Sequence, residues 1–540
     1  MKRILLLLII VVAFSLRFYQ LGSNPPALDW DEVSLGYNAY SLLKTGNDEY
    51  GMRLPTVLTS FGDYKPALYA YAAIPIILIT NLSDLGVRLP SALIGVLTIF
   101  AVYGLIKRLF YQSSYHTRLA LLVSLFMSIS PWHIQFSRVA FEANMGLFWL
   151  IIGAWLFLLA LRKRPFFLLA LGAIICSLYS YHSLRLIVPL FFFVLILRLK
   201  KRVIQFDRWL FLTIFMGLIL IFPLIQVMVN PEGLQRFSAV TLFRQTEGLG
   251  NEIEFQQDDL RRNDVLGYIL HNRRVGYVKA VMAGYLDHFN PSFLFLTGDQ
   301  YERHEAADMG LLYFWDAFFI LLGMLVFLAL GGFPRFFILT WFFLAPLASS
   351  LTMGTPHAVR ALYFLPTYQV FTALGLLSVL HFFKKKGKMK FIVMFGAMIF
   401  LVLNIIYYLN LYFIHTPLEK SQYWQYGYKN VVDDVMKISN NYQKIVITTA
   451  YDQPYIYFLF YGQIDPEWYQ KNASHVVSRD ERNFSKFDFR PIQWTTDRTL
   501  QKTLFVLSPQ DFQRITADVV RPIKTIRFLD GSVAFYLVER

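Results

Sequence analysis

The sequence has few charged residues and a single cysteine. Only 16% of its 540 residues are charged, whereas a soluble domain carries about 25%. The one cysteine, Cys176, lies in an apolar block, so there is no disulfide framework and the cysteines do not indicate a redox compartment. No phosphate-cradling P-loop, internal repeat or low-complexity tract is found. The absences argue against an ordinary soluble protein, a disulfide scaffold and a P-loop nucleotide site.

Apolar residues are abundant instead, at 56% of the chain, and 17% of the chain is aromatic. They come in blocks of about 17 to 25 residues, the length that crosses a hydrocarbon core. The first block has the basic start of a signal peptide but lacks a small-x-small cleavage site, so we expect a retained helix. We predict an α-helical polytopic membrane protein with about eleven transmembrane helices, at 4–20, 86–108, 117–133, 143–161, 165–180, 184–199, 209–228, 311–332, 335–352, 358–381 and 390–412.

The block "ALYAYAAIPIILIT" (67–80) is apolar but short, and it contains Pro75. Counting it as a span gives twelve spans and turns the basic loops outward, against the positive-inside rule. We therefore expect a juxtamembrane helix in the first outer loop. With eleven spans and a cytoplasmic N-terminus, the net charge of +15 lies mostly in cytoplasmic loops, so no nucleic-acid partner is expected. Those loops are "KR" (107–108), "LRKRP" (161–165), "LRLKKR" (197–202), "FPR" (333–335) and "FFKKKGKMK" (382–390).

This topology predicts two domains. Residues 1–415 form the transmembrane domain, with outer loops at 21–85 and 229–310. Residues 416–540 alternate helical and strand-like stretches such as "TLFVLSP" and "VAFYLVE", which indicates a soluble α/β domain. We expect a multi-pass protein of the cell membrane whose C-terminal domain is extracytoplasmic and, from its position, binds the acceptor.

Three carboxylates follow the first span in "DWDE" (29–32). A carboxylate at the membrane surface is costly in contact with lipid, so it should face a cavity or a partner. Asp31 could take a proton from an acceptor hydroxyl while Glu32 positions that hydroxyl. Alternatively, Asp29 or Asp31 only caps the helix "EVSLGYNAYSLLK". The Asp29-x-Asp31 pair also resembles a metal ligand pair, so a divalent cation is possible, although no cofactor is certain.

Cations and histidines gather on the same outer side. Lys65, before Pro66, can neutralise a phosphate or only snorkel, and Arg138 and Glu142 can pair with each other at i and i+4. Each of these residues alone is typical of a structural position, but together they suit a phosphate, which at this surface belongs to a lipid. The further candidates are His182, Arg185, His304, His357 and Arg360.

The order of the motifs "DEVSLGYNAYSLLKTG", "GDYKPALYAY" and "GVRLPSALIGVLTIFAVYGLIKRLF" resembles membrane glycosyltransferases that use polyprenyl-phosphate sugars. These are the protein O-mannosyltransferase and lipid A aminoarabinose transferase families, with the C-type glycosyltransferase fold. The resemblance covers about residues 1 to 200, and "TPHAVRALYFLP" is similar to a late-membrane element of these enzymes. It implies a membrane glycosyltransferase whose partners are a lipid-linked sugar donor and a protein, lipid or glycan acceptor.

The resemblance also implies roles for residues. Asp31 matches the acidic residue that acts as base or orients the acceptor, and Glu32 is its companion. Lys65 matches a lysine at the donor phosphate, where Arg138, His357 and Arg360 are further candidates. The aminoarabinose transferases carry an acidic residue just before this lysine, whereas Tyr64 stands there in this chain. That departure puts a metal site like that of the family in doubt. Glu142 falls where a second acidic residue of the family lies.

Direct attack of an acceptor hydroxyl on the anomeric carbon would invert its configuration. Two other classes stay open: a transporter or flippase, and a polysaccharide polymerase or ligase that handles lipid-linked glycans. A transporter would place charges in mid-span and show inverted repeats, whereas the sequence has few mid-span charges and no obvious repeat. A third alternative is a sensor whose C-terminal domain binds sugar. The sequence does not identify the sugar or the acceptor.

Overall fold

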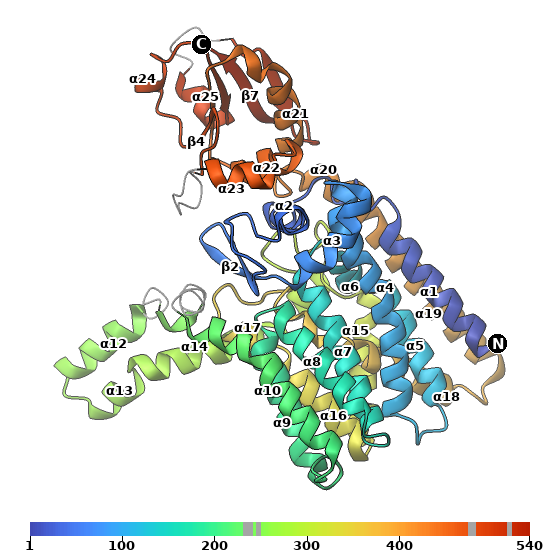
Figure 1. Ribbon diagram of the computed structural model, residues 1–540. Helices are drawn as coiled ribbons and strands as arrows, with labels where there is room; N and C mark the ends of the chain where they lie inside the picture. Colours follow the sequence, from blue (N-terminus) through green and yellow to red (C-terminus); the bar gives the residue numbers. More distant parts are fainter. Residues whose placement is uncertain (231–240, 245–249, 474–481, 516–520) are drawn as a thin grey trace. The chain divides into compact units, whose positions relative to one another are not determined.

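The computed structural model describes residues 1–230, 241–244, 250–473, 482–515 and 521–540. The chain forms two compact units (Figure 1). One comprises Met1–Ala13, Gly95–Phe136 and Ala143–Tyr408, and the other comprises Phe14–Ile94, Ser137–Glu142 and Leu409–Arg540. The second unit thus combines the segment after the first helix with the C-terminal segment. The domain boundary between 415 and 416 stays a prediction.

Each of the eleven expected spans coincides with a helix of the structure. In the described part of the chain, six helices are long and apolar enough to cross a membrane, or seven if α5 and α6, bent by 57°, form one span. The exact number of eleven spans stays a prediction. The helices that lie within the eleven expected spans, with α5 and α6 sharing one of them, are α1 (Lys2–Phe18), α4 (Asp84–Leu109), α5 (His116–Ile129), α6 (Pro131–Arg138), α7 (Glu142–Ala160), α8 (Phe166–Ser180), α9 (Leu184–Val203), α10 (Arg208–Val229), α15 (Phe314–Ala329), α16 (Gly332–Leu344), α18 (Thr367–Phe382) and α19 (Gly387–Asn410).

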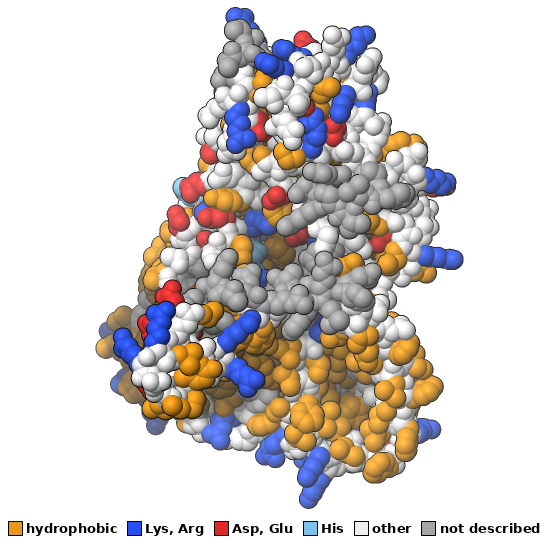
Figure 2. Space-filling model, turned by 90° about the vertical axis from the view of Figure 1, so that its left-hand side faces the viewer, with side chains coloured by type: hydrophobic (Ala, Val, Ile, Leu, Met, Phe, Trp, Pro, Cys, Tyr) orange, Lys and Arg blue, Asp and Glu red, His pale blue; other side chains and the backbone are white. Residues whose placement is uncertain are grey.

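Two of these helices turn almost all of their apolar side chains outward. Only 6% of the most apolar stretch of α10 and 11% of that of α19 is buried. Phe215 on α10 and Phe391 on α19 are more than half exposed, and Figure 2 shows hydrophobic side chains crowded over the lower part of one face. A soluble protein does not expose apolar surface on this scale, so these helices are suited to contact with lipid.

The basic loops assigned to the cytoplasmic side come together in the first unit. Arg108, Arg162, the segment 197–202 and Pro334 line one cavity of about 630 Å³. They come from four of the five expected cytoplasmic loops, which therefore lie at the same end of the helices. This arrangement agrees with the expected alternation of the spans. The side that faces the cytoplasm stays a prediction of the positive-inside rule.

The loop expected over 229–310 is largely helical where it is described. Residues 231–240 and 245–249 of this loop lie outside the described residues. Its described helices are η1 (Leu242–Arg244), α12 (Gly250–Arg261), α13 (Val265–Leu270), α14 (Arg273–Asp287) and η3 (Ser292–Leu296). Two short helices, α17 (Leu347–Ser350) and η4 (Leu362–Phe364), lie later in the chain, between α16 and α18.

The second unit begins with the segment after α1. It contains helix α2 (Trp30–Thr45), the hairpin β1 (Val57–Ser60) and β2 (Asp63–Pro66), and α3 (Leu68–Thr80). Helix α3 is the short helix expected at 67–80, and its 13 residues are too few to span the bilayer alone. One end of α2 packs beside the C-terminal segment, where the Gln470 amide donates to Ser41 Oγ at 3.0 Å and to the Asp48 carbonyl at 2.8 Å.

The C-terminal segment forms the expected α/β structure. Its sheet has the strand order β4-β3-β5-β7-β6, parallel from β4 to β5 and antiparallel beyond. The central strand "TLFVL" is buried along its whole length, as expected for a strand covered on both faces. The strands are β3 (Lys444–Ile447), β4 (Phe487–Phe489), β5 (Thr503–Leu507), β6 (Lys524–Arg527) and β7 (Val533–Glu539). The helices of the segment are η5 (Leu411–His415), α20 (Thr416–Glu419), α21 (Tyr428–Ile438), η6 (Ser439–Asn441), α22 (Pro454–Tyr461), α23 (Pro466–Asn472), α24 (Trp494–Asp497) and α25 (Pro509–Ile515).

Helices α15 and α18 of the first unit pack closely through two facing glycines, and this packing yields a prediction. A Cβ atom on Gly323 would overlap the Phe371 carbonyl, and one on Gly375 would overlap the Phe319 carbonyl. Gly323→Val should therefore push the helices apart and lower the melting temperature of the purified protein by several degrees. Gly396→Val on α19 is the matched control, because a Cβ there meets no atom within 4 Å. Equal melting temperatures for the two variants would contradict this packing.

Candidate functional site

The first carboxylate of "DWDE" caps helix α2. Asp29 Oδ1 accepts a hydrogen bond from the Glu32 backbone N–H at 2.8 Å, and Glu32 Oε2 accepts one from the Asp29 N–H at 3.3 Å. This reciprocal pair is a capping box, which satisfies N–H groups that a helix start leaves open. The structure thus confirms the capping interpretation for Asp29. A side chain that is 1% exposed and used as a cap is poorly placed as a metal ligand.

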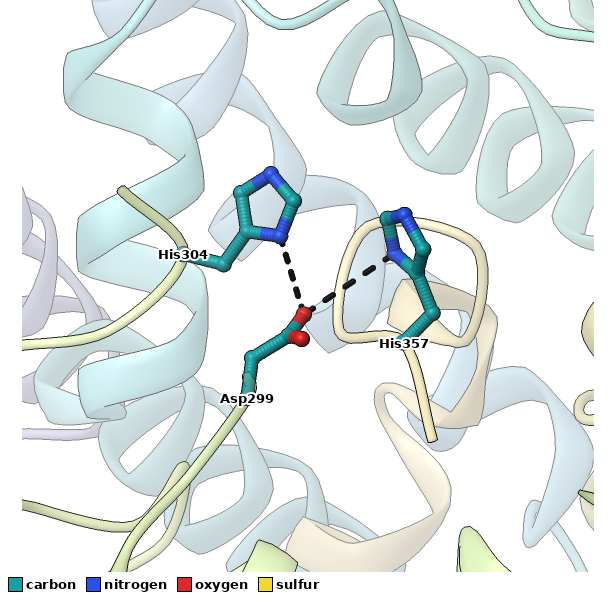
Figure 3. A group of neighbouring side chains, drawn as sticks. All are labelled: Asp299, His304 and His357. Carbon is teal, nitrogen blue, oxygen red and sulfur yellow. Dashed lines mark hydrogen bonds and ion pairs between the residues drawn. The ribbon is translucent and has the colours of Figure 1, made fainter. Parts of the chain in front are cut away.

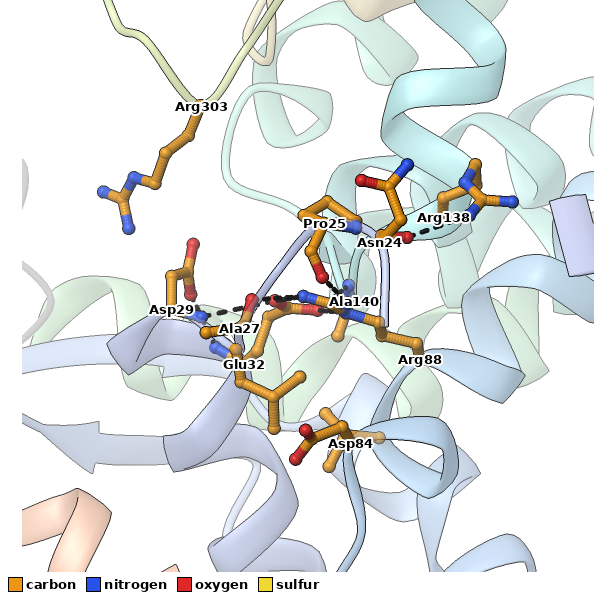
Figure 4. Close-up of polar contacts among 12 residues, drawn as sticks. Asn24, Pro25, Ala27, Asp29, Glu32, Asp84, Arg88, Arg138, Ala140 and Arg303 are labelled. Atoms are coloured by element: carbon orange, nitrogen blue, oxygen red, sulfur yellow. Dashed lines mark hydrogen bonds and ion pairs between the residues drawn. The ribbon is translucent and has the colours of Figure 1, made fainter. Parts of the chain in front are cut away.

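The carboxylate of Glu32 is fully engaged by protein donors (Figure 4). Arg88 binds it in a fork, from Nε to Oε1 and from Nη2 to Oε2, both at 2.9 Å. The Ala140 N–H donates to Oε1 at 3.0 Å, in addition to the Asp29 N–H on Oε2. Both side chains of the ion pair are at most 1% exposed. Since four donors surround Glu32, we infer that it positions α2, while a direct catalytic role stays an untested prediction.

Arg88 is equally saturated. Its remaining N–H groups donate to the carbonyls of Leu21, Pro25 and Ala27, so all five N–H groups of the guanidinium have acceptors. These carbonyls line the turn between α1 and α2. Arg88 therefore fixes the backbone of the segment that leads into α2 and Asp31.

Asp31 is turned differently and is 40% exposed as a side chain. It forms an ion pair with Lys65, whose side chain is 9% exposed. The Lys65 ammonium also lies 4.5 Å from the centre of the Phe61 ring. Strand β2 fixes Lys65 opposite Leu58 of β1. The structure thus brings together two of the predicted site residues, a carboxylate with solvent access and a nearly buried cation.

Arg138 does not present its guanidinium to such a site. It is fully buried, and it donates to the carbonyls of Leu16 and Asn24 at 2.9 Å and to the Tyr412 hydroxyl at 3.2 Å. All three of its nitrogens bind protein groups, which joins the end of α1 to the C-terminal segment. This geometry does not support the prediction that Arg138 binds a donor phosphate, and the prediction stays untested.

The other two predicted residues of this unit lie at element ends or edges and are half-buried. Tyr64 faces Thr59 in the β1–β2 hairpin. Glu142 is the first residue of α7, where its charge suits the positive end of the helix dipole.

A buried polar group that the sequence interpretation missed lies in the same unit. Glu49 is completely buried, and in the described part of the chain neither of its carboxylate oxygens has a hydrogen-bond partner. Arg482 lies over the Tyr50 ring at 3.7 Å and donates to the Glu49 carbonyl at 3.4 Å. Burial raises the pKa of Glu49 to about 7, although the charge of Arg482 opposes this shift.

The first unit holds a second group of site candidates. His304 Nδ1 lies 2.9 Å from Asp299 Oδ2, and His357 Nδ1 lies 3.9 Å from the same oxygen (Figure 3). All three side chains are buried. Within the described residues, this is the only group of three or more His, Cys, Asp or Glu side chains arranged to hold a metal ion. The sequence analysis named both histidines but not Asp299.

The remaining candidates lie elsewhere in the first unit. Arg360 is half-buried, and its Nη1 donates to Thr352 Oγ1 at 2.7 Å and to the Met353 carbonyl at 2.8 Å. His182 and Arg185, at the start of α9, are both half-buried, and Arg185 donates weakly to the Leu178 carbonyl at 3.4 Å. None of these contacts by itself assigns a chemical role.

Comparison with known proteins adds to this picture. Residues 64–226 match the family model of dolichyl-phosphate-mannose-protein mannosyltransferases. The match includes Lys65 and the "RLPSAL" element but not the "DWDE" segment. No curated protein matches the chain in sequence.

Among solved structures, ArnT from Cupriavidus metallidurans bound to undecaprenyl phosphate is similar with a TM-score of 0.56 and 11% identity, over 98% of this chain and 97% of that chain. The same enzyme in the apo state gives a TM-score of 0.54 and 12% identity. The chain has the C-type glycosyltransferase fold. The resemblance inferred from the sequence is thereby confirmed.

The archaeal oligosaccharyltransferase AglB from Archaeoglobus fulgidus, in complex with an inhibitory peptide and a dolichol-phosphate, is a more distant structure. It has a TM-score of 0.47 and 15% identity. The chain covers 63% of the length of AglB, less than two thirds, while 85% of this chain is matched.

The two adjacent carboxylates of this C-type fold should respond differently to neutralisation. Glu32→Gln leaves the buried Arg88 charge unpaired, which costs about 3–5 kcal/mol in comparable buried pairs. Asp31→Asn removes a partly exposed pair, worth about 0–1 kcal/mol. Thermal unfolding of the purified protein should show a large loss for the first variant and little change for the second. A similar loss for both variants would contradict this division.

Glu49 predicts a pH dependence of stability. Its folded-state pKa of about 7 exceeds the ordinary value of 4.5, so between these values the folded protein binds more protons than the unfolded chain. Stability from this group is therefore greatest below about pH 4.5 and falls as pH rises to about 7. The Glu49→Gln variant lacks this titrating group. Its melting temperature minus that of the wild type should therefore increase as the pH rises from about 5 to about 8. A constant difference between the two proteins would refute the raised pKa.

Proposed function

We propose that the protein is a membrane glycosyltransferase that moves a sugar from a polyprenyl-phosphate donor to an acceptor hydroxyl at the outer face of the membrane. The observation that carries this proposal is the pairing of Asp31 with Lys65 in a chain of the C-type fold. The lipid binding named for ArnT and the family matched over 64–226 support the donor class. The transferred sugar, hexosyl or pentosyl, is left open.

The pair supplies the two charges that this reaction needs. Lys65 neutralises the phosphate that leaves the anomeric carbon, and a nearly buried ammonium does so more effectively than an exposed one. Asp31 is partly exposed, so an acceptor hydroxyl can reach it and give up its proton.

In the proposed step, the acceptor oxygen forms a bond to the anomeric carbon while the bond from that carbon to the phosphate oxygen breaks. The acceptor proton passes to Asp31, and the electron pair of the broken bond stays on the polyprenyl phosphate beside Lys65. A single displacement of this kind inverts the anomeric configuration. Glu32 and Arg88 take no proton in this step, because they hold the turn and the start of α2.

The ion pair seen here is then the resting arrangement. A donor phosphate competes with Asp31 for the Lys65 ammonium, so binding of the donor removes the Lys65 ion pair from the carboxylate at the moment when a base is required. A base needs its oxygen within hydrogen-bond reach of the acceptor, and loss of the ion pair with Lys65 makes the Asp31 carboxylate more available for that contact.

The test is transfer from a panel of labelled polyprenyl-phosphate sugars by the full chain in proteoliposomes. Asp31→Asn should lower the transfer rate by about 10²–10⁴-fold, the usual worth of a positioned general base. Lys65→Met should also lose transfer, whereas Lys65→Arg should recover part of it. Glu419→Gln is the control, since this exposed carboxylate pairs with His415 at a helix end and should keep wild-type activity.

If the transfer rate of Asp31→Asn were within a few-fold of the wild-type rate, Asp31 would not be the general base. No transfer from any donor by a well-folded wild-type protein would favour the flippase or the polysaccharide polymerase instead. Turnover confined to donors added on the basic-loop side would refute an outer active site.

A further inference from the structure

A basic cavity lies at the end of the first unit where the loops assigned to the cytoplasmic side meet. Its volume is about 630 Å³, and all the residues that line it belong to that unit. We propose that this cavity binds the phosphate group of an anionic phospholipid. The site contains neither Asp31 nor Lys65, so the proposal goes beyond the transferase function and does not depend on it.

The lining of the cavity carries charge of one sign. Its charged residues are all cations, and no Asp or Glu is found among the described residues that line it. The carboxylate nearest in the chain to the segment 197–202 is Asp207, which Arg164 binds in a fork at 2.8 and 3.1 Å. An anion in the cavity would therefore meet cations without a competing carboxylate. The six cations are Arg108, Arg162, Arg198, Lys200, Lys201 and Arg202.

Two of these arginines meet on the ring of Tyr111. The Arg108 guanidinium lies 4.9 Å from the ring centre, and the Arg162 guanidinium lies 4.6 Å from it. A hydrogen bond from Arg162 lowers the pKa of the Tyr111 hydroxyl, and the charges of both arginines act in the same direction. Two cations held against one ring repel each other, and an anion bound beside them would offset that repulsion.

Arg108 is held in a fixed orientation and still has a donor to offer. Its Nε and Nη2 donate to the Leu158 carbonyl at 3.2 and 3.0 Å, which orients the planar guanidinium. Its Nη1 has no hydrogen-bond acceptor within the described part of the chain. A planar, permanently charged donor of this kind suits the oxygens of a phosphate group.

Two simpler explanations account for single cations but not for the cavity. Basic residues in the last turn of a helix, such as Lys200 and Lys201 in α9, complement the helix dipole. The positive-inside rule also places basic residues in cytoplasmic loops. Neither explanation requires separate segments of the chain to converge on one hollow, or two guanidinium groups to share one ring.

Apolar side chains in the same lining favour a lipid over a soluble anion. Leu109, Leu161, Leu197 and Phe333 line the cavity together with the cations. The lining lies at the ends of α4, α7 and α9 and at the start of α16, which is the depth of the headgroups in a bilayer that these helices cross. Basic pockets between transmembrane helices are suited to anionic headgroups, whose acyl chains can follow the apolar helix faces.

The test is the binding of phosphatidylglycerol to the delipidated full chain in detergent, measured by native mass spectrometry. Phosphatidylcholine with the same acyl chains is the zwitterionic reference, and the wild type should bind the anionic lipid several-fold more tightly. The double variant Lys200→Gln, Lys201→Gln changes two exposed residues of the lining. It should bind phosphatidylglycerol about fivefold more weakly or worse, because a basic residue near an anionic headgroup is worth about that factor.

The double variant Lys384→Gln, Lys385→Gln is the matched control. It removes the same charge from two exposed lysines of another expected cytoplasmic loop, and neither lysine lines the cavity. This control should keep the wild-type affinity. Equal loss of affinity in the two double variants, or equal binding of the two lipids by the wild type, would overturn the proposal.

Inorganic phosphate distinguishes the two sources of the anion. It offers the same oxygens to the arginines but has no acyl chains, so it should displace phosphatidylglycerol from the wild type only at far higher concentration than the lipid itself. Displacement at a similar concentration would assign the cavity to a soluble phosphate and overturn the lipid as its occupant. These measurements read binding directly, so they remain decisive even if no sugar transfer is found.

Discussion

The buried ion pair between Glu32 and Arg88 is the constraint on which the second unit depends. Its two charges are removed from water, so each must be matched by a partner and by further hydrogen bonds. Arg88 meets this demand with three carbonyls of the turn at 21–27, and Glu32 meets it with two backbone N–H groups. A turn, a helix start and α4 are thereby fixed to one another, and the neighbouring residue Asp31 acquires a defined position.

Neighbouring carboxylates can therefore serve different purposes because their environments differ. Asp29 satisfies the start of α2, Glu32 neutralises a buried cation, and Asp31 keeps access to solvent beside Lys65. Two of the three carboxylates of "DWDE" are therefore structural. Only the least buried of the three is in a position to exchange its partner, which a group that moves a proton must do.

The sequence predicted the elements well because apolar blocks and turn residues are local signals. The helices at all eleven expected spans, α3, and the α/β character of residues 416–540 follow from such patterns. The motif order placed Asp31 and Lys65 among the candidates for one site, but it did not predict their ion pair. The roles of Arg88, Glu49 and Asp299 were missed, because a partner 56 residues away, a buried loop carboxylate or a shared carboxylate leaves no periodic signal. Arg138 was expected at a phosphate for its charge, while its actual partners are distant carbonyls and a tyrosine hydroxyl.

The central claim is that Lys65 passes from Asp31 to the donor phosphate. The most direct measurement is the affinity for polyprenyl phosphate without sugar, by titration in nanodiscs, for the wild type, Asp31→Asn and Lys65→Met. Because Asp31→Asn removes the competitor for the ammonium, it should bind the lipid phosphate several-fold more tightly, and Lys65→Met should bind it much more weakly. Weaker binding by Asp31→Asn, or unchanged binding by Lys65→Met, would contradict the account.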